Sequence, residues 1–402
     1  MGDRSSVVDA VRPGLTSRGR EVKAIVLSTN NYLSFPSRKQ RFARHLVAQG
    51  FEVLYVEAPV TVLAAALPGQ RQKIGRWKAG IVNQGDGLWT ASPSPWLPFF
   101  KQYERIADHD AAVYYRWLRN LSGSWVHDAG LVLTYMPFVP RTLELIGAPV
   151  LYDCVDDHSA YPGFIDKNTV NRLETRTAQL ASGIIATNET IAGKFRSFEA
   201  KTSLIQNGVD HHLFAEPALT WLASQSVLQR QRKFLYVGAM REWFDTRLVS
   251  AVAKLYPEWT IDCYGDATPS VRQELAACTN VVLCGNAPQA VIAQLAGRYD
   301  VALIPFRECP LTAGIDPLKF YEYSSAGLPV VSSRINALGV FGDDMVRMAS
   351  TAEEFAEAVA QSMTSDSLEV RRWRIESSHR FDWSYRLQEF DRALEAIRLT
   401  KA

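Results

Sequence analysis

The sequence predicts an α/β protein with two doubly wound halves, each built on its own parallel sheet. Two observations lead to this fold class. Short apolar runs alternate with amphipathic helical segments along most of the 402 residues, which is the pattern of parallel strands covered by helices on both faces. The alternation stops over 206–231 and then starts again, which indicates two halves joined by a connector.

The first half opens with a βαβ unit. The run 23–28 predicts a buried strand, 38–49 predicts a helix that Gly50 ends, and 51–57 predicts the next strand. This spacing suits a right-handed parallel crossover. Further strands are expected at 131–134, 150–153, 183–186 and 202–205, and helices at 103–118, 141–146, 171–181 and 189–198.

The second half repeats the alternation and ends on a long helix. Strands are expected at 233–237, 260–264, 280–283, 300–304 and 329–332, and helices at 246–255, 270–277, 287–297, 317–326, 351–362 and 383–399. The predicted organisation is a flexible segment (1–21), an N-terminal domain (22–206), a connector (207–231), a C-terminal domain (232–380) and a helix that packs back on the N-terminal domain (381–402).

Composition excludes several classes of protein. The net charge of +2, from 44 Lys+Arg and 42 Asp+Glu, provides no positive excess for nucleic acid. The apolar run 60–67 is shorter than the ~18 residues of a membrane-spanning helix, and the N-terminus lacks the apolar stretch of a secretory signal. Five cysteines without a Cys-x-x-Cys pair predict free, buried or half-buried thiols and a cytoplasmic protein.

The segment 315–333, IDPLKFYEYSSAGLPVVSS, suggests a phosphate site. Asp316 is expected to cap a helix that Gly327 ends. Lys319 would lie in the first turn, where a cation opposes the helix dipole unless an anion binds there. Glu322 could then reach a hydroxyl pair beside the phosphate. The alternative is that both are solvated helix charges. Neither Gly-x-Gly-x-x-Gly nor Gly-x4-Gly-Lys-Ser/Thr occurs.

A family resemblance follows from these motifs. DPLKFYEYSSAGLPVVSS resembles the donor-nucleotide helix of bacterial group 1 glycosyltransferases, and NGVD (207–210) with Phe214 resembles their interdomain hinge. FLYVGAM (234–240) and GNAPQAVIAQLAGRYDVALIPF (285–306) match the same pattern, as does SRKQRFARHLVAQGFEVLYVE (37–57). The resemblance covers about residues 22–399. It implies the GT-B architecture, two Rossmann-like domains facing across a cleft, with a C-terminal helix crossing back.

The resemblance also implies donor-binding residues. Glu322 would hold ribose hydroxyls, Lys319 and the 312–314 loop would meet the diphosphate, and Gly238 would let the backbone approach it. The implied donor set is Gly238, Arg241, Thr312, Gly314, Lys319, Tyr321 and Glu322. Gly314 stands where the family's first Glu is expected, and the usual Lys after Arg241 is missing. These departures bring the chain nearer to exopolysaccharide and teichuronic-acid transferases, some of them glucuronosyltransferases.

Two further groups complete the predicted site. Asp156, Asp157 and His158 follow a buried strand at its carboxyl end, where one of them could take the proton of an acceptor hydroxyl. Alternatively, the aspartates cap a helix or close an Asx turn. Being adjacent, the three cannot easily point at one ion, so no metal is expected. The loop 29–41 is expected on the acceptor side, where the predicted residues are Asn30, Asn31, Arg38 and Arg41. Arg38, Lys39 and Arg41 would meet an anionic group such as a lipid diphosphate; the alternative is that they are ordinary surface charges at a solvated helix start.

The expected function is a cytoplasmic, metal-independent glycosyltransferase without a cofactor. Its partners would be a nucleotide-sugar donor, expected to be a UDP-sugar, and a lipid-linked or saccharide acceptor at the inner membrane face. The aromatic loop 96–100 could dip into that interface or belong to the core. The alternatives are a UDP-sugar epimerase of the same fold and a non-catalytic glycosyltransferase subunit. Inverting and retaining mechanisms both stay open.

Overall fold

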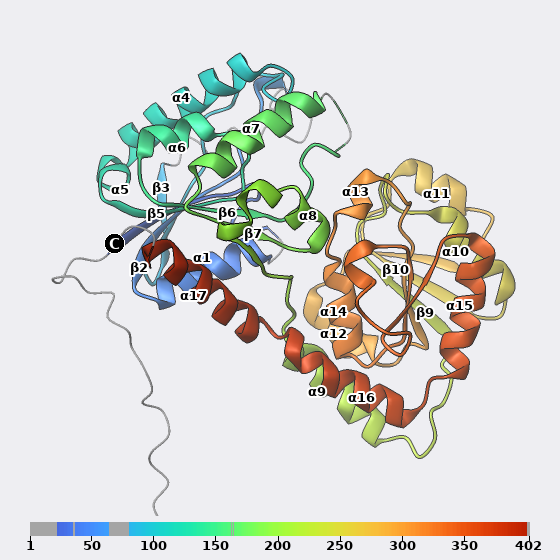
Figure 1. The fold of residues 1–402 in the computed structure, drawn as a ribbon. Helices are drawn as coiled ribbons and strands as arrows, with labels where there is room; N and C mark the ends of the chain where they lie inside the picture. Colours follow the sequence, from blue (N-terminus) through green and yellow to red (C-terminus); the bar gives the residue numbers. More distant parts are fainter. Residues whose placement is uncertain (1–21, 35–36, 64–79, 162, 164, 400–402) are drawn as a thin grey trace, which may run out of the picture. The chain divides into compact units, whose positions relative to one another are not determined.

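The computed structural model describes residues 22–34, 37–63, 80–161, 163 and 165–399. It contains two sheets flanked by helices (Figure 1), which confirms the predicted α/β fold with two parallel-sheet domains. One sheet has eight strands in the order β3-β4-β2-β1-β5-β6-β7-β8, and the other has six in the order β11-β10-β9-β12-β13-β14. The predicted flexible segment 1–21 lies outside the described residues.

The elements up to residue 204 supply the eight-stranded sheet. Its strands are β1 (Val22–Leu27), β2 (Phe51–Val56), β3 (Ile81–Gly85), β4 (Leu88–Ala91), β5 (Ala129–Thr134), β6 (Val150–Cys154), β7 (Gly183–Ala186) and β8 (Thr202–Leu204). The helices are α1 (Arg38–Ala48), α4 (Glu104–Leu121), α5 (Gly123–His127), α6 (Pro140–Ile146), α7 (Lys167–Leu180), α8 (Glu189–Gly193) and the 3₁₀ helix η1 (Arg196–Lys201).

The remaining elements belong to the six-stranded sheet and the segments around it. The strands are β9 (Lys233–Val237), β10 (Thr260–Tyr264), β11 (Val281–Gly285), β12 (Val301–Ile304), β13 (Val330–Ser333) and β14 (Val346–Ala349). The helices are α9 (His211–Ala223), α10 (Thr246–Leu255), α11 (Pro269–Leu275), α12 (Gln289–Ala296), α13 (Pro310–Ala313), α14 (Leu318–Ser325), η2 (Asn336–Leu338), α15 (Ala352–Thr364), α16 (Leu368–Ser378), η3 (His379–Phe381) and α17 (Trp383–Leu399).

The chain folds into two compact units. The first comprises Met1–Tyr152 with Arg172–Ala181, and the second comprises Asp153–Asn171 with Ser182–Ala402. The second unit therefore contains the loop after β6 together with the whole six-stranded sheet. The domain boundaries predicted from the sequence stay predictions.

The six-stranded sheet is covered on both faces because its inner strand β12 is apolar and buried at every position. Along β12, Ala302 and Ile304 face a core formed with α9, α12 and α14, whereas Val301 and Leu303 face a core formed with α10 and α15. Side chains alternate between the faces of a strand, so a continuous apolar run needs helices on both sides.

The connector predicted at 207–231 contains a helix that the sequence pattern missed. Phe214, Ala218 and Leu222 of α9 are buried in the core shared with α12 and α14. Pro217 lies inside this helix, and a proline there argues against a helical prediction. Packing against the sheet outweighs that local penalty.

Other observed elements also differ from the predicted ones. The β3–β4 hairpin, β14, α13 and α16 were not predicted, and the helix expected at 189–198 ends at Gly193 before the 3₁₀ turn η1. The aromatic loop divides: Trp96 is buried against Phe100 and Tyr114, but Leu97 and Phe99 are 42% and 44% exposed. Among the described residues, no helix is both long and apolar enough to cross a membrane. Four thiols are buried or half-buried as predicted, and Cys284 is exposed.

His211, at the start of α9, is buried beside two other histidines. Its ring lies 5.3 Å from that of His379 and 5.9 Å from that of His212, measured between centroids. Its Nδ1 lies 3.2 Å from the Ser325 hydroxyl, and its backbone N–H donates to Asp382. Burial, and then the two histidines, lower the pKa of His211 to about 4, although Asp382 acts in the opposite direction.

We expect this histidine to make the protein less stable below pH 6.5. In the unfolded chain a histidine binds a proton at about pH 6.5, whereas folded His211 resists protonation down to about 4. The unfolded state therefore binds more protons in this window, so the free energy of unfolding falls as pH drops through it. Urea denaturation at several pH values should show a shallower fall in His211→Asn. The control His127→Asn, an exposed histidine of α5 outside this cluster, should retain the wild-type slope; identical slopes in all three proteins would contradict the assignment.

Candidate functional site

The loop after β6 holds the Asp156 carboxylate in a half-buried position, where it can accept hydrogen bonds. Its Oδ2 accepts a hydrogen bond of 3.0 Å from the Tyr161 hydroxyl. Burial, and then the negative charge of Asp156, raise the pKa of the Tyr161 phenol, so this hydroxyl stays protonated and donates. Within the described part of the chain, no other side chain or backbone group is bonded to this carboxylate. The second oxygen of Asp156 thus remains open to a ligand.

Asp157, the next residue, is already committed to protein partners. Its Oδ1 lies 2.7 Å from Lys194 Nζ and accepts from both the backbone N–H and the hydroxyl of Ser159. Burial acts to raise its pKa, but Lys194 and Ser159 outweigh it and hold the pKa of Asp157 below its usual range. Asp157 therefore closes an Asx turn, the structural alternative considered above. His158 is buried, with its ring stacked 6.1 Å from that of Tyr161.

Helix α14 presents a lysine and a glutamate that neutralise each other. Lys319 Nζ lies 2.6 Å from Glu322 Oε2, and Gln289 Nε2 donates to Glu322 Oε1 at 2.8 Å. Only 4% of Glu322 is exposed, so it is not a solvated helix charge. A diphosphate that drew Lys319 away would leave Glu322 able to accept from hydroxyl groups.

Asp316 is buried and anchors the start of α14, although the predicted N-cap is wrong by one residue. Pro317 is the N-cap, and Asp316 instead accepts from the Asn207 backbone N–H at 2.6 Å and from the Tyr321 hydroxyl at 2.5 Å. Tyr321 is fully buried and in this structure positions Asp316. A direct contact between Tyr321 and the donor stays a prediction. Gly327 follows the end of the helix with φ of +76°, as predicted.

The loop 309–315, which leads into α14, is tightly packed. The Thr312 hydroxyl accepts from the Cys309 N–H at 3.0 Å and donates to the Arg307 carbonyl at 2.5 Å. The Gly314 carbonyl accepts from Asn188 Nδ2 at 2.9 Å. A Cβ on Gly314 would lie 3.3 Å from Ile191 Cδ1 and 3.6 Å from Asp157 Cβ. This crowding offers a physical reason for glycine where the resemblance leads one to expect glutamate.

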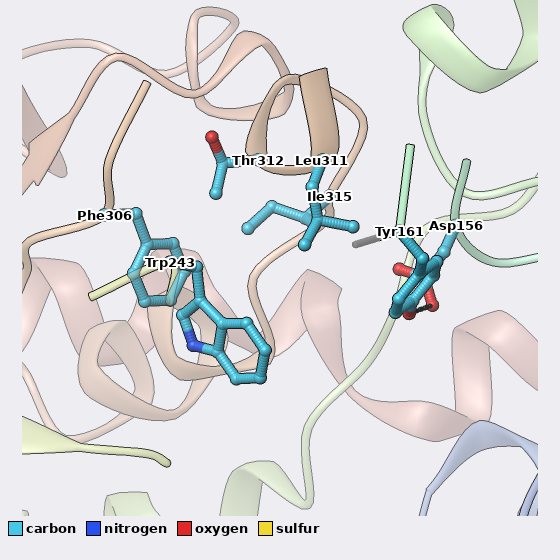
Figure 2. Close-up of a pocket in the computed structure, with 7 residues that line it drawn as sticks. All are labelled: Asp156, Tyr161, Trp243, Phe306, Leu311, Thr312 and Ile315. Atoms are coloured by element: carbon cyan, nitrogen blue, oxygen red, sulfur yellow. Dashed lines mark hydrogen bonds between the residues drawn. The ribbon is translucent and has the colours of Figure 1, made fainter. Parts of the chain in front are cut away.

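Asp156 and this loop line one pocket of about 190 Å³, all of whose residues belong to the second unit. The lining residues are Asp156, Tyr161, Trp243, Phe306, Leu311, Thr312 and Ile315. Figure 2 shows the rings of Trp243 and Phe306 on one side, Asp156 and Tyr161 on the other, and Leu311 and Ile315 between them. The pocket is thus apolar over most of its wall, with a carboxylate at one end.

Three glycines meet where β9, β10 and β11 end. The Gly238 N–H donates to the Tyr264 carbonyl at 2.8 Å, and the Gly265 N–H donates to the Gly285 carbonyl at 2.8 Å. Gly265 has φ of +138°, and a Cβ there would lie 2.0 Å from the Gly238 carbonyl oxygen. The sequence analysis singled out Gly238 and missed the other two. Nearby, the half-exposed Arg241 pairs loosely with Asp266 at 3.5 Å.

Replacing Gly265 with alanine should destabilise the protein by roughly 2–4 kcal/mol, since the change combines backbone strain with a steric clash. The expected readout is a lower urea midpoint at an unchanged m-value. Gly342→Ala is the matched control, because a Cβ there meets nothing within 4 Å. Equal midpoints for the two variants would show that the strand ends can move apart.

The predicted acceptor-side residues lie together in the first unit, where β1 ends. Lys39 Nζ donates to Thr29 Oγ1 at 2.6 Å and to Asn30 Oδ1 at 3.3 Å. Arg38 is 3% exposed, with its guanidinium over the Phe42 ring at 4.7 Å. The Asn31 carbonyl accepts from the Ser34 N–H, and Arg41 on α1 is half-buried. Arg38 and Lys39 are therefore largely inside the fold and not ordinary surface charges.

Comparison with known proteins shows what the part of the chain around the pocket is similar to. Residues 231–365 match the family model described as "Glycosyl transferases group 1". This part of the chain is therefore similar to group 1 glycosyltransferases. The putative teichuronic acid biosynthesis glycosyltransferase TuaH of Bacillus subtilis is 25% identical over 202 residues, which span 46% of this chain and 50% of that protein. The match thus spans about half the length of this curated relative. The resemblance to teichuronic-acid transferases is confirmed.

Solved structures support the two-sheet fold of this chain. Sucrose-phosphate synthase from Thermosynechococcus elongatus aligns with a TM-score of 0.69 at 14% identity, covering 95% of this chain and 100% of that chain. Anabaena HepE in complex with UDP-glucose aligns at 0.64 and 14%, covering 94% and 100%. An E. coli trehalose-6-phosphate structure bound with UDP-2-fluoro glucose aligns at 0.65 and 12%, covering 92% and 98%. Identities this low establish the shared GT-B fold alone.

Several residues around the pocket were not predicted from the sequence. Tyr161, Trp243 and Phe306 line it, Gln289 binds Glu322, and Lys194 neutralises Asp157. Trp243 directly follows Arg241 and Glu242, in the segment where the lysine that the resemblance leads one to expect is missing. An aromatic residue at this position was the feature of the sequence that could have indicated a role in the pocket. Among the described residues, no group of three or more His, Cys, Asp or Glu side chains is arranged to hold a metal ion.

Proposed function

We propose that the protein transfers a sugar from a UDP-sugar to a hydroxyl group of a surface-polysaccharide or glycolipid acceptor. One observation carries the proposal: a single compact unit contains the open carboxylate of Asp156 and the loop that leads from the same pocket into α14. The complexes of HepE with UDP-glucose and the role of TuaH in teichuronic acid biosynthesis support the donor and the acceptor class, respectively.

The donor would bind at the start of α14. In the proposal, Lys319 and the positive end of the helix dipole bind the diphosphate, and Glu322 accepts hydrogen bonds from the ribose hydroxyls. Lys319 Nζ lies 2.6 Å from Glu322 Oε2 in this structure. Binding of the donor would separate this pair, so that Lys319 contacts the diphosphate and Glu322 contacts the ribose. The same positive groups would stabilise the charge that develops on the departing UDP.

Asp156 would act as the general base. As the acceptor oxygen bonds to the anomeric carbon, the bond from that carbon to the diphosphate oxygen breaks, and its electron pair leaves with UDP. The acceptor's proton passes to the second carboxylate oxygen of Asp156, while Tyr161 holds the first. A base in this role belongs to an inverting transfer, so the product should carry the opposite anomeric configuration to the donor.

The acceptor would meet the first unit. Lys39, Arg38 and Arg41, with Asn30 and Asn31, gather positive charge and amides where β1 ends and α1 begins. This chemistry suits an anionic acceptor such as a lipid-linked diphosphate, and it would place the enzyme at the cytoplasmic face of a membrane.

The proposed mechanism requires no metal ion, because Lys319 and the α14 N-terminus provide the positive charge for the leaving group. Treating the purified protein with EDTA should therefore leave the rate of UDP release unchanged within about twofold. Protein treated with EDTA and then resupplied with Mg²⁺ or Mn²⁺ is the control. A loss of rate that either ion restores would remove metal independence from the proposal.

Calorimetry and product analysis test the proposed function directly. The proposal expects the full chain to bind UDP and to release UDP from a UDP-sugar only when an acceptor is present. Conversion of the free donor without an acceptor would instead indicate an epimerase. No UDP binding at all would indicate a non-catalytic subunit.

A further inference from the structure

The pocket that Asp156 shares with Trp243 has a chemistry that discriminates among sugars. At about 190 Å³ it is smaller than the roughly 300–1,000 Å³ of typical small-molecule sites, so it suits one sugar ring and not a whole nucleotide sugar. Its side chains come from three segments, after β6, after β9 and after β12. They are half-buried or exposed at the pocket wall, apart from the buried Thr312.

Trp243 and Phe306 form a fixed aromatic wall. The segments that carry them are paired: Phe244 forms a β-bridge with Phe306, and the Arg307 N–H donates to the Trp243 carbonyl at 2.7 Å. The indole N–H of Trp243 donates to the Ala239 carbonyl at 3.2 Å, which orients the ring. An aromatic face of this kind packs against the C–H face of a pyranose, since both surfaces are apolar.

Among the residues that the structure describes, no basic side chain lines the pocket. Three basic groups in the neighbouring segments are each paired with a carboxylate: Arg241 with Asp266, Arg307 with Glu274 and Lys319 with Glu322. The Thr312 hydroxyl is used by its own loop, so Thr312 adds no free donor. The charged group that the pocket wall presents is therefore the Asp156 carboxylate, which attracts hydroxyl donors and repels a second carboxylate.

We infer that this pocket holds the transferred sugar of the donor and selects an uncharged pyranose, such as a neutral hexose or an N-acetylhexosamine, over a hexuronic acid. Trp243 adds affinity by stacking on the sugar ring, and the Asp156 carboxylate determines the preference by repelling a second carboxylate. The inference rests on the proposed function and departs from the glucuronosyl donors that some similar transferases use. A uronate carboxylate would face Asp156 and an apolar wall with no basic side chain to bind it (Figure 2).

Calorimetry on the full chain with UDP, UDP-glucose, UDP-N-acetylglucosamine and UDP-glucuronate tests the inference. At least one uncharged donor should bind about tenfold or more tightly than UDP, since ring stacking adds to the nucleotide contacts. UDP-glucuronate should bind no more tightly than UDP. A preference for UDP-glucuronate over both uncharged donors would overturn the inference.

Variants separate stacking and charge from a general loss of structure. Trp243→Ala should remove the gain of the uncharged donor over UDP and leave UDP affinity within about twofold. Trp373→Ala is the control, because it makes the same chemical change on α16, where Trp373 is 45% exposed and outside the pocket. Asp156→Asn should strengthen UDP-glucuronate binding about tenfold by removing the like charge. An undiminished sugar gain in Trp243→Ala would overturn the inference.

The same titrations distinguish the two levels of proposal. If UDP itself does not bind, the proposed function fails and this inference fails with it. If UDP binds and supports transfer but no uncharged sugar adds affinity, only the inference about the pocket is wrong.

Discussion

Replacing Asp156 with asparagine is expected to lower kcat for sugar transfer by about 10²–10⁴-fold, the usual contribution of a general base. An amide cannot take the acceptor's proton at neutral pH, but it fills the same space and can still accept from Tyr161. UDP binding should change by no more than about twofold, because Asp156 belongs to the loop after β6 and not to α14. Initial rates of UDP release and calorimetry with UDP measure the two quantities separately.

Asp157→Asn is the matched control for this prediction, since it makes the same chemical change one residue away. Asp157 already binds Lys194 and Ser159, so its loss should act mainly on stability. Because its pKa is lowered in the folded state, its stabilising contribution is present above the ordinary carboxyl pKa of about 4 and is lost as pH falls below it. Unchanged turnover in Asp156→Asn would remove Asp156 from the mechanism, and a larger loss in Asp157→Asn would transfer the role to its neighbour.

Replacing Asp366 with alanine should destabilise the protein by about 3–5 kcal/mol, because it leaves two buried arginines without their counter-ion. Asp366 Oδ2 lies 2.8 Å from Arg371 Nε, and Oδ1 lies 2.6 Å from Arg374 Nη1. Both arginine side chains are 1% exposed, and Arg371 also donates to the carbonyls of Gly297 and Tyr299. Arg371, held by Asp366, therefore fixes α16 against the segment before β12. Urea denaturation with the linear extrapolation method measures the loss.

Asp343→Ala is the control for Asp366→Ala. Asp343 pairs with Arg347 at 2.9 Å, but its side chain is 77% exposed, so its loss should cost no more than about 1 kcal/mol. A similar small loss in both variants would mean that water reaches Arg371 and Arg374 once Asp366 is gone. The aspartate–arginine distances are comparable, so the two variants differ in burial and in the number of arginines that the aspartate binds.

The regular elements follow from local patterns in the sequence. The strands β7, β9 and β10 and the helices α10 and α17 have the predicted limits, because continuous apolar runs and 3.6-residue stripes are properties of neighbouring residues. Helix α9 shows where this fails: its proline lowers the local preference for a helix, and only burial of Phe214 against the six-stranded sheet compensates.

The candidate site, too, was predicted from the sequence only in part. The motif DPLKFYEYSS identifies α14 and its Lys319–Glu322 pair from consecutive residues, and the strand before Asp156 and Asp157 places both acids at a carboxyl end. Which of the two is open depends on Lys194, 37 residues further along the chain. Gln289 reaches Glu322 across 33 residues in the same way.

The sequence by itself therefore determined the α/β class, the strands and helices with strong local periodicity, and the family resemblance. The tertiary structure alone decided that Asp157 is neutralised, that Glu322 is buried, and that Trp243 and Phe306 form the wall of the pocket with Asp156 at its other end. The physical reason is that periodicity and capping act within a few residues, whereas charge pairing and pocket formation depend on side chains that only packing brings together.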